Sequence, residues 1–239
     1  MARKALTLDQ MKALAAPLAA AKNVPLPLVL AIAAHESGGF CPWATRGEPQ
    51  IGDASIGLMQ VLVSTARANG YTGIVGSWDN TTNTGTGLYD PATNLRYGVA
   101  YLAGLLKSTG GDIERTVAAY NAGLGHSQRV TVTTRFCLAW KPTAPKTGRN
   151  LDRDCANIYT AKPGEFLNQP YVNTIMSLAR TYGFVASGGV TIPGASQGAG
   201  APSTSTKSGA TYFVVSATML AVAAAVVGIM WMAQHARNG

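Results

Sequence analysis

Residues 28–37 read LVLAIAAHES, an almost wholly apolar run that ends in a histidine and a glutamate. Pro27 suits the first turn of a helix and two glycines follow the run, so a buried helix is predicted here. Glu36 lies at its end and is the only acid in residues 10–47. Apolar neighbours raise the pKa of a carboxyl, which produces a general acid usable near neutral pH. The alternative is a helix-end glutamate that faces water.

Several familiar catalytic motifs are absent. A zinc-binding HExxH motif that starts at His35 needs a second histidine at position 39, which is glycine. His126 and His235 are distant in sequence, so we expect neither a metal nor a cofactor. Ser55 lies in GDASIG, which does not match the nucleophile motif G-x-S-x-G. Basic residues do not interleave with aromatic ones, so no specific nucleic-acid binding is expected.

Three further motifs follow Glu36 in order along the chain. They are GLMQ at residues 57–60, Asp90–Pro91 followed by Asn94, and AYNAG at residues 119–123. Each begins or ends a predicted element. Together with the Glu36–Ser37 pair, this order resembles the catalytic domain of soluble lytic transglycosylases, in the lysozyme-like superfamily. The resemblance covers about residues 25 to 183 and implies a mainly α (α+β, lysozyme-like) globular domain.

The resemblance implies that Glu36 is the sole catalytic carboxyl. It protonates the oxygen of the β-1,4 bond between N-acetylmuramic acid and N-acetylglucosamine, and its carboxylate then takes the proton from the muramic C6 hydroxyl. That hydroxyl closes onto C1 and gives a 1,6-anhydro end without water. One group serves as acid and then as base because the first step leaves it in the form that the second needs. The substrate's own acetamido group stabilises C1, so no second carboxylate is required.

The same resemblance gives substrate roles to other positions. Gln60 and Asn121 hydrogen-bond sugar or acetamido groups, and Met59 lines the cleft. Tyr120 lies near the catalytic carboxyl and orients it or the glycan, while Ser37 braces the loop that follows. The alternatives are core packing for Met59 and Tyr120, and a helix C-cap for Asn121.

One segment departs from the family pattern. Many members have Ser-x-x-Gly-Ala before GLMQ, whereas residues 52–56 read GDASI here. Goose-type lysozymes, related enzymes, place an aspartate just before GLMQ, where it positions a water molecule. Asp53 and Ser55 are therefore further candidates for the substrate site. If Asp53 plays that role, the enzyme is a muramidase with a reducing product; the alternative is that Asp53 is a turn residue. A third interpretation is a non-catalytic glycan-binding or membrane-channel component.

Helix-start and helix-end signals divide the rest of the chain. The predicted elements are an amphipathic helix within residues 1–24, a loop over 41–56, a short strand over 56–63, a helix capped by Ser64 and ended by Gly70, a loop over 71–89, helices capped by Asp90 and Asp112 and ended by Gly110 and Gly123, an irregular region over 124–163, and a closing helix over 170–182 with Tyr171, Ile175, Leu178 and Ala179 facing inward.

The three cysteines allow one disulfide. Cys137 and Cys155 bracket a loop in the irregular region, and a bond between them contributes on the order of 3 kcal/mol in the chain-entropy model. The alternative is that Cys41 pairs with either of them. A disulfide indicates an oxidising, extracytoplasmic environment. The basic residues over 129–153 suit the carboxylates of peptidoglycan stem peptides, or they face solvent.

The composition indicates a concentrated apolar segment. Hydrophobic residues make up 47% and charged residues 13% of 239 residues, with a net charge of +8 that favours anionic partners. Residues 212–233 carry no charge, and a membrane-spanning helix needs about 20 such residues. The alternative is a buried core helix. Residues 186–211 are rich in Gly, Ser, Ala and Thr and predict a flexible linker.

The predicted organisation is an N-terminal helix (1–24), a lysozyme-like domain (25–185), a linker (186–211), a transmembrane helix (212–233) and a short tail (234–239). Charges interrupt residues 1–22, so no secretory signal peptide is recognised there. We therefore expect a single-pass protein of a virion membrane or tail that acts in the host envelope, or a component of an envelope machine. The expected partners are peptidoglycan glycan strands, a lipid membrane, and virion or envelope-complex proteins.

Overall fold

The computed structural model describes residues 3–49, 51–141 and 150–185 of the chain. Its helices are α1 (Leu8–Ala21), α2 (Leu26–Glu36), α3 (Val63–Ala68), α4 (Pro91–Ser108), α5 (Ile113–Ala122), α6 (Leu151–Asp154) and α7 (Gln169–Thr181), with 3-10 turns η1 (Gly87–Tyr89) and η2 (Leu124–His126). Its strands are β1 (Thr45–Glu48), β2 (Asp53–Ile56), β3 (Val61–Leu62), β4 (Trp78–Asp79), β5 (Thr84–Gly85), β6 (Thr134–Trp140) and β7 (Cys155–Ala161). They form three antiparallel sheets, ordered β1-β2-β3, β4-β5 and β6-β7.

The described part of the chain is therefore mainly helical with small β elements, as predicted. The predicted linker over 186–211 and the predicted transmembrane helix over 212–233 lie outside the described residues. Within the ranges that are described, no helix combines the length and the apolar character needed to cross a bilayer.

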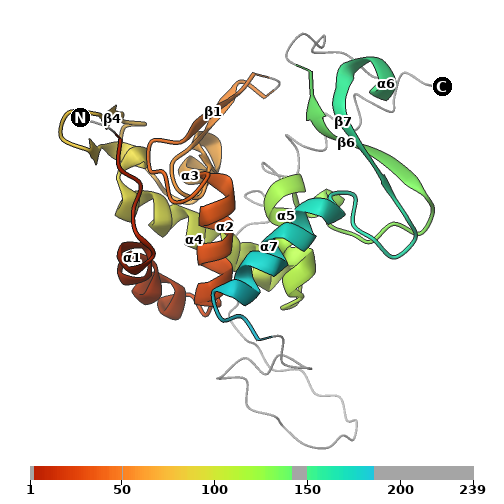
Figure 1. Cartoon of the computed structure of the whole chain (residues 1–239), viewed down its shortest axis with the longest axis horizontal. Coiled ribbons are helices and arrows are strands. Elements are labelled where there is room, and N and C mark those ends of the chain that lie inside the picture. Colours follow the sequence, from red (N-terminus) through yellow and green to blue (C-terminus); the bar gives the residue numbers. More distant parts are fainter. Residues whose placement is uncertain (1–2, 50, 142–149, 186–239) are drawn as a thin grey trace, which may run out of the picture.

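Five helices, α1, α2, α4, α5 and α7, enclose one apolar core (Figure 1). Residues 28–33 of α2 are each at most 1% exposed, which places this helix at the centre. The N-terminal helix buries Met11, Ala15 and Ala19 and packs against α2 and α4. Helix α1 thus shares its core with the domain that follows.

Side-chain caps start the longer helices at the predicted positions. Asp90 and Asp112 accept hydrogen bonds from the backbone three residues further on, at 2.7 and 2.9 Å, at the starts of α4 and α5. The predicted Ser64 cap is wrong. The carboxylate of Asp53 accepts from the Ser64 N–H at 3.1 Å instead, so a neighbouring strand supplies the cap of α3.

The predicted loop over 41–56 is wrong, because β1 and β2 form a hairpin there. Thr45 pairs with Ile56, and Glu48 pairs with Asp53. The predicted strand over 56–63 is a turn followed by the two-residue β3. β1 reads TRGE and is mostly exposed on both faces, so it lacks the apolar alternation by which a strand is recognised. The predicted loop over 71–89 contains the small β4–β5 hairpin.

The predicted irregular region over 124–163 contains a two-stranded ribbon, β6–β7. The predicted Cys137–Cys155 disulfide is confirmed, with 5.7 Å between the Cα atoms, and Cys41 is a free thiol. β7 buries only its first and last residues, which explains why no period of two marks it in the sequence. In Figure 1 this ribbon and the β1–β2 hairpin both extend to the same side of α2 and α7.

Asn94, which is fully buried on α4, ties the turn between β2 and β3 to the helical core. Its Oδ1 accepts from the Met59 N–H at 2.9 Å, and its Nδ2 donates to the carbonyls of Ile56 and Leu88 at 2.7 and 2.9 Å. Gly57 has a φ of +73°, and a Cβ there would lie 2.5 Å from Asn94 Nδ2. The turn therefore needs both the glycine and the amide.

We expect Asn94→Leu to lower the free energy of unfolding by about 3–5 kcal/mol, measured by chemical denaturation. It leaves one N–H and two carbonyls buried without partners, each at a cost of about 1–3 kcal/mol. Asn173→Leu, at an exposed position on α7, is the matched control and should change the stability by about 0.5 kcal/mol or less. Equal effects of the two substitutions would contradict the stabilising role of the Asn94 hydrogen bonds.

Candidate active site

The end of α2 carries Glu36 out of the apolar core. Glu36 is the last residue of the helix and is half-buried. The next residue, Ser37, is buried; its hydroxyl donates to the Ala33 carbonyl at 2.6 Å and accepts from the Cys41 N–H at 3.1 Å. Both bonds fix the loop that leaves the helix. The bracing role predicted for Ser37 matches this geometry, whereas a contact of its hydroxyl with substrate would have to break it.

Tyr171 holds the Glu36 carboxyl in place. Its hydroxyl donates to Glu36 Oε1 at 2.5 Å, from the first turn of α7. The ring of His35 packs edge-on against the Tyr171 ring, with 5.2 Å between the centroids. We predicted Tyr171 as an inward residue of the closing helix and did not include it among the site residues. Its role as the partner of Glu36 becomes visible only when α2 and α7 are packed together.

The surroundings of Glu36 favour its neutral form. Burial raises the pKa of Glu36; the Tyr171 hydrogen bond and the charges of His35 and Arg46 oppose this, and the charge of Glu48 adds to it. The net direction is a rise above the ordinary value. This is the shift expected from the apolar sequence around Glu36, and it keeps a proton available for a leaving group.

Tyr120 lies beside this carboxyl without bonding to it. Its hydroxyl donates to the Met59 carbonyl at 2.8 Å, and its ring packs 5.4 Å from that of Tyr101. Burial, followed by the charge of Glu36, raises the pKa of Tyr120 well above its ordinary value. The hydroxyl is therefore a neutral donor that supports the GLMQ turn. Tyr171, and not Tyr120, donates to Glu36 in this structure, and the other predicted role of Tyr120, orientation of the glycan, stays a prediction.

The GLMQ turn holds two of the predicted site residues, Gln60, which is half-buried, and Met59, which is buried. Gln60 Nε2 donates to the carbonyls of Ala44 and Gly57 at 3.1 and 2.9 Å, so its Oε1 is the atom left to accept a bond. Met59 is 0% exposed and packs on Gly98, where a Cβ would lie 2.4 Å from its sulfur. The prediction that Met59 lines the cleft is wrong in this structure, and core packing describes its position.

Asn121 is exposed at the last turn of α5. Its Oδ1 accepts from Asn168 Nδ2 at 3.0 Å, and the same Nδ2 donates to the Ala118 carbonyl at 3.1 Å. The fully buried Asn168 thus turns the Asn121 amide so that its Nδ2 is the free end. A donor at this position suits the sugar or acetamido contact predicted for Asn121.

The two remaining candidates, Asp53 and Ser55, lie on β2. Asp53 accepts from the Ala54 N–H at 2.7 Å and caps α3 through its other oxygen, so both oxygens have structural partners. This geometry favours a structural role over a catalytic one, although Asp53 begins strand β2 and is not the turn residue of the predicted alternative. Ser55 is buried and donates to Glu48 Oε1 at 3.3 Å. Glu48 in turn pairs with Arg46 at 3.4 Å, and these two charged residues of β1 were not among the predicted site residues.

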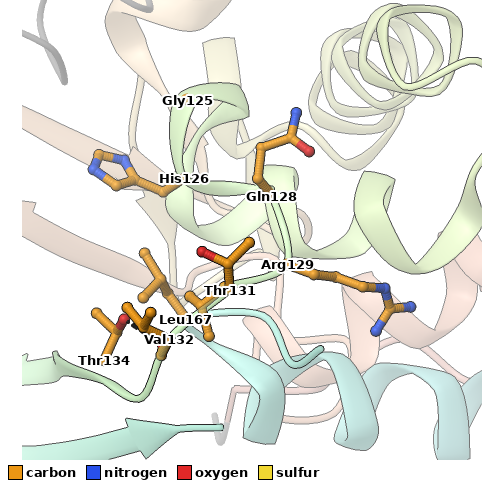
Figure 2. A pocket seen from close by; sticks show the side chains of 9 residues that line it. Gly125, His126, Gln128, Arg129, Thr131, Val132, Thr134 and Leu167 are labelled. Carbon is orange, nitrogen blue, oxygen red and sulfur yellow. Dashed lines mark hydrogen bonds between the residues drawn. The ribbon is translucent and has the colours of Figure 1, made fainter. Parts of the chain in front are cut away.

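A separate pocket of about 270 Å³ lies between the end of α5 and the start of β6. It contains none of the predicted site residues. Figure 2 shows the Arg129 side chain pointing away from Val132 and Thr134. Its guanidinium pairs with Glu114 at 2.5 Å, and in the same region Arg135 pairs with Asp152. Lys146 and Arg149 of the same basic stretch lie outside the described residues, and the contact with wall carboxylates stays a prediction.

No metal centre emerges from the ranges that the structure covers, where no three His, Cys, Asp or Glu side chains converge. The end of α2 brings the Glu36 carboxyl together with its partner Tyr171 and the nearby Tyr120.

A family model, that of the transglycosylase SLT domain, matches residues 14–140, more than half of the chain. The chain belongs to this transglycosylase family. The predicted lytic transglycosylase domain is thereby confirmed. Among solved structures, an inactive variant of the lytic transglycosylase Slt from Pseudomonas aeruginosa is similar, at 22% identity with a TM-score of 0.46. The match covers 72% of this chain and 24% of that one, so this chain spans about a quarter of the length of Slt.

We expect Tyr171→Phe to raise the pKa of Glu36 further, because the lost hydroxyl stabilises the charged form. NMR titration of carbon-13-labelled glutamate side chains measures this directly. The alkaline limb of the activity profile should move to higher pH, because the proton on the acid is then retained longer. Tyr97→Phe is the control, since Tyr97 packs on Tyr71. An unchanged or lower pKa in Tyr171→Phe would show that the hydroxyl does not hold the carboxylate.

Proposed function

We propose that this transglycosylase breaks the β-1,4 bond between N-acetylmuramic acid and N-acetylglucosamine and leaves a 1,6-anhydro end. The observation that carries the proposal is the Glu36 carboxyl, whose pKa is raised by burial and which Tyr171 holds at 2.5 Å. A raised pKa favours the protonated carboxyl, which is the form that can donate a proton to the glycosidic oxygen.

The proposed reaction uses Glu36 twice. Its proton goes to the bridging oxygen as the C1–O bond breaks, and N-acetylglucosamine leaves as the alcohol. The carboxylate that results accepts the proton of the muramic C6 hydroxyl, whose oxygen forms the new bond to C1. Tyr171 keeps the carboxylate oriented between the two steps, and water is not consumed.

The neighbouring acids support a single-carboxylate mechanism. A hydrolase of the inverting or retaining type needs a second carboxylate to activate water or to bond to C1. Asp53 is occupied by two backbone N–H groups, and Glu48 by Arg46 and Ser55. Neither acid is left as a base, which favours intramolecular attack over the muramidase alternative.

We expect Glu36→Gln to reduce the release of muropeptides from peptidoglycan by about 10²–10⁴-fold, the usual contribution of a general acid–base. Mass spectrometry of the products should show 1,6-anhydro ends with the unsubstituted protein. Glu114→Gln, which alters an exposed ion pair, should keep full activity. Asp53→Asn should also keep the anhydro product. Reducing ends that vanish in Asp53→Asn would instead identify a muramidase, and no release by any protein would favour a glycan-binding component.

We also propose that residues 212–233 anchor the protein in a membrane, in a virion or in an envelope complex. The support is the absence of any charge across this apolar stretch. Attachment would restrict cutting to the wall next to that membrane.

The full chain should therefore stay in the membrane fraction after an alkaline carbonate wash. Replacing both Leu220 and Val226 by Arg should release it, because each arginine at a helix centre costs about 3 kcal/mol of insertion free energy. Thr204→Arg, in the predicted linker, is the control and should remain attached. Release of the unsubstituted chain by the wash would contradict the anchor, and absence from purified particles would contradict the virion location.

A further inference from the structure

A second pocket lies on the other side of the β1–β2 hairpin from Arg46 and Glu48. It has a volume of about 520 Å³, within the range of about 300–1,000 Å³ found for small-molecule sites. Its walls come from four separate segments: the N-terminal stretch, the start of β1, the β4 region and η1. The lining residues are Arg3, Trp43, Ala44, Thr45, Gly76, Ser77, Trp78 and Tyr89.

Three half-buried aromatic rings dominate this pocket. The rings of Trp43 and Trp78 lie 5.6 Å apart and are inclined at 55°, and the guanidinium of Arg3 lies over Trp43 at 5.9 Å. Tyr89 brings its hydroxyl to the same place, where it accepts from the Thr45 hydroxyl at 2.8 Å. The arrangement combines apolar ring faces with hydroxyl groups at the rim.

Contacts of the backbone fix two segments of the pocket wall. The Ala44 carbonyl next to Trp43 accepts from Gly57 N–H at 2.7 Å and from Gln60 Nε2 at 3.1 Å. Gly76 packs so tightly that a Cβ would lie 1.9 Å from the Thr86 carbonyl oxygen. Preorganised walls lower the entropic cost of binding.

One polar atom at this site has no partner. The indole Nε1 of Trp78 is buried and meets no acceptor in the part of the chain that the structure describes. Buried donors are nearly always paired, and an unpaired one calls for an explanation. A ligand oxygen that the Trp78 ring can turn toward would supply the missing acceptor.

These features match the chemistry of an N-acetylated sugar. A pyranose ring presents C–H groups, which carry partial positive charge, and the face of an aromatic ring carries the complementary negative charge. Its hydroxyl and acetamido groups suit the rim formed by Thr45, Ser77 and Tyr89. A fully apolar ligand would leave those groups unpaired, and an anion would meet only Arg3, which already donates to Asn80 at 2.6 Å.

Successive residues of a strand point to opposite faces, so Thr45 and Arg46 belong to different sides of the hairpin. The Thr45 hydroxyl donates to Tyr89, which lines the pocket. Arg46 pairs with Glu48 on the opposite face of the strand, and the charges of both residues affect the pKa of Glu36. In Figure 1 the N-terminal stretch and β4 lie to the left of the hairpin, and α7, which carries Tyr171, lies to its right. The pocket and the Glu36 carboxyl therefore lie toward opposite faces of the hairpin, an arrangement that suits the binding of two different glycan strands.

We propose that the pocket between Trp43, Trp78 and Tyr89 is a second carbohydrate-binding site, which holds an N-acetylated sugar of a glycan strand other than the one being cut. The proposal rests on the proposed function for its choice of ligand. It makes the enzyme bivalent toward the cell wall.

The test uses the full chain in detergent with nitrogen-15-labelled tryptophan and the Glu36→Gln substitution, which prevents turnover. Titration with a tetrasaccharide of N-acetylglucosamine should shift the indole N–H signals of Trp43 and Trp78 and leave those of the other tryptophans unchanged. Trp78→Phe removes the Trp78 indole signal and so assigns it. Because this variant keeps an aromatic ring and loses only the Nε1 donor, it should weaken sugar binding less than Trp78→Ala does. Trp78→Ala should weaken sugar binding about tenfold, the scale of a lost aromatic stacking contact. Tetrasaccharide binding without shifts at Trp43 or Trp78 would overturn the proposal, as would shifts caused by a stem peptide and not by the sugar.

A second readout separates this inference from the catalytic proposal. In the chain with Glu36 intact, Trp78→Ala should reduce the cutting of intact cell walls while the cutting of short soluble glycan fragments is unchanged. Equal losses on both substrates would indicate a disturbed catalytic site and overturn the proposal. The unsubstituted enzyme could release no product while the sugar still shifts the indole signals and Trp78→Ala still weakens sugar binding. In that case the proposed function fails and the second site stands.

Discussion

The burial of one carboxyl group at the end of an apolar helix is the constraint on which this site depends. α2 lies at the centre of the core because residues 28–33 are apolar on every face. Its last residue, Glu36, is therefore placed where the chain leaves the core, half out of water. Burial raises the pKa of this acid and the Tyr171 hydroxyl partly offsets the rise. An arginine in place of Tyr171 would orient the carboxylate equally well but would lower its pKa and remove the acid.

The choice of tyrosine as the partner has a second consequence. Burial and the charge of Glu36 raise the pKa of both Tyr171 and Tyr120 well above the ordinary value. The two hydroxyls therefore remain donors when Glu36 is protonated and when it is ionised. Tyr171 donates a hydrogen bond to the Glu36 carboxyl, and Tyr120 donates one to the Met59 carbonyl in the neighbouring turn. The site can thus change its charge by one proton without rearranging the groups around it.

Local signals in the sequence predicted the longer helices but not α6, the cap of α3 or the contacts between helices. Asp90 and Asp112 mark helix starts because a cap and its helix lie within four residues. The Tyr171–Glu36 contact joins residues 135 positions apart, and no pattern in a single sequence connects them. Asp53 was ambiguous because a carboxylate before GLMQ fits a catalytic or a turn role, and only the position of α3 shows what it bonds. The β1 strand was missed because it buries neither face.

The β1–β2 hairpin links the two faces at which this enzyme is proposed to meet the wall. On one face, Arg46 and Glu48 contribute opposing charges to the environment of Glu36; on the other, Thr45 meets Tyr89. The proposed substrate, the cell wall, is a network of glycan strands, so a weak second contact would raise the effective concentration of the first. Because the neighbouring residues Thr45 and Arg46 of β1 lie at the two sites, the hairpin fixes the spacing between these sites. A rigid spacing would select neighbouring strands at one separation, which a catalytic groove alone cannot do.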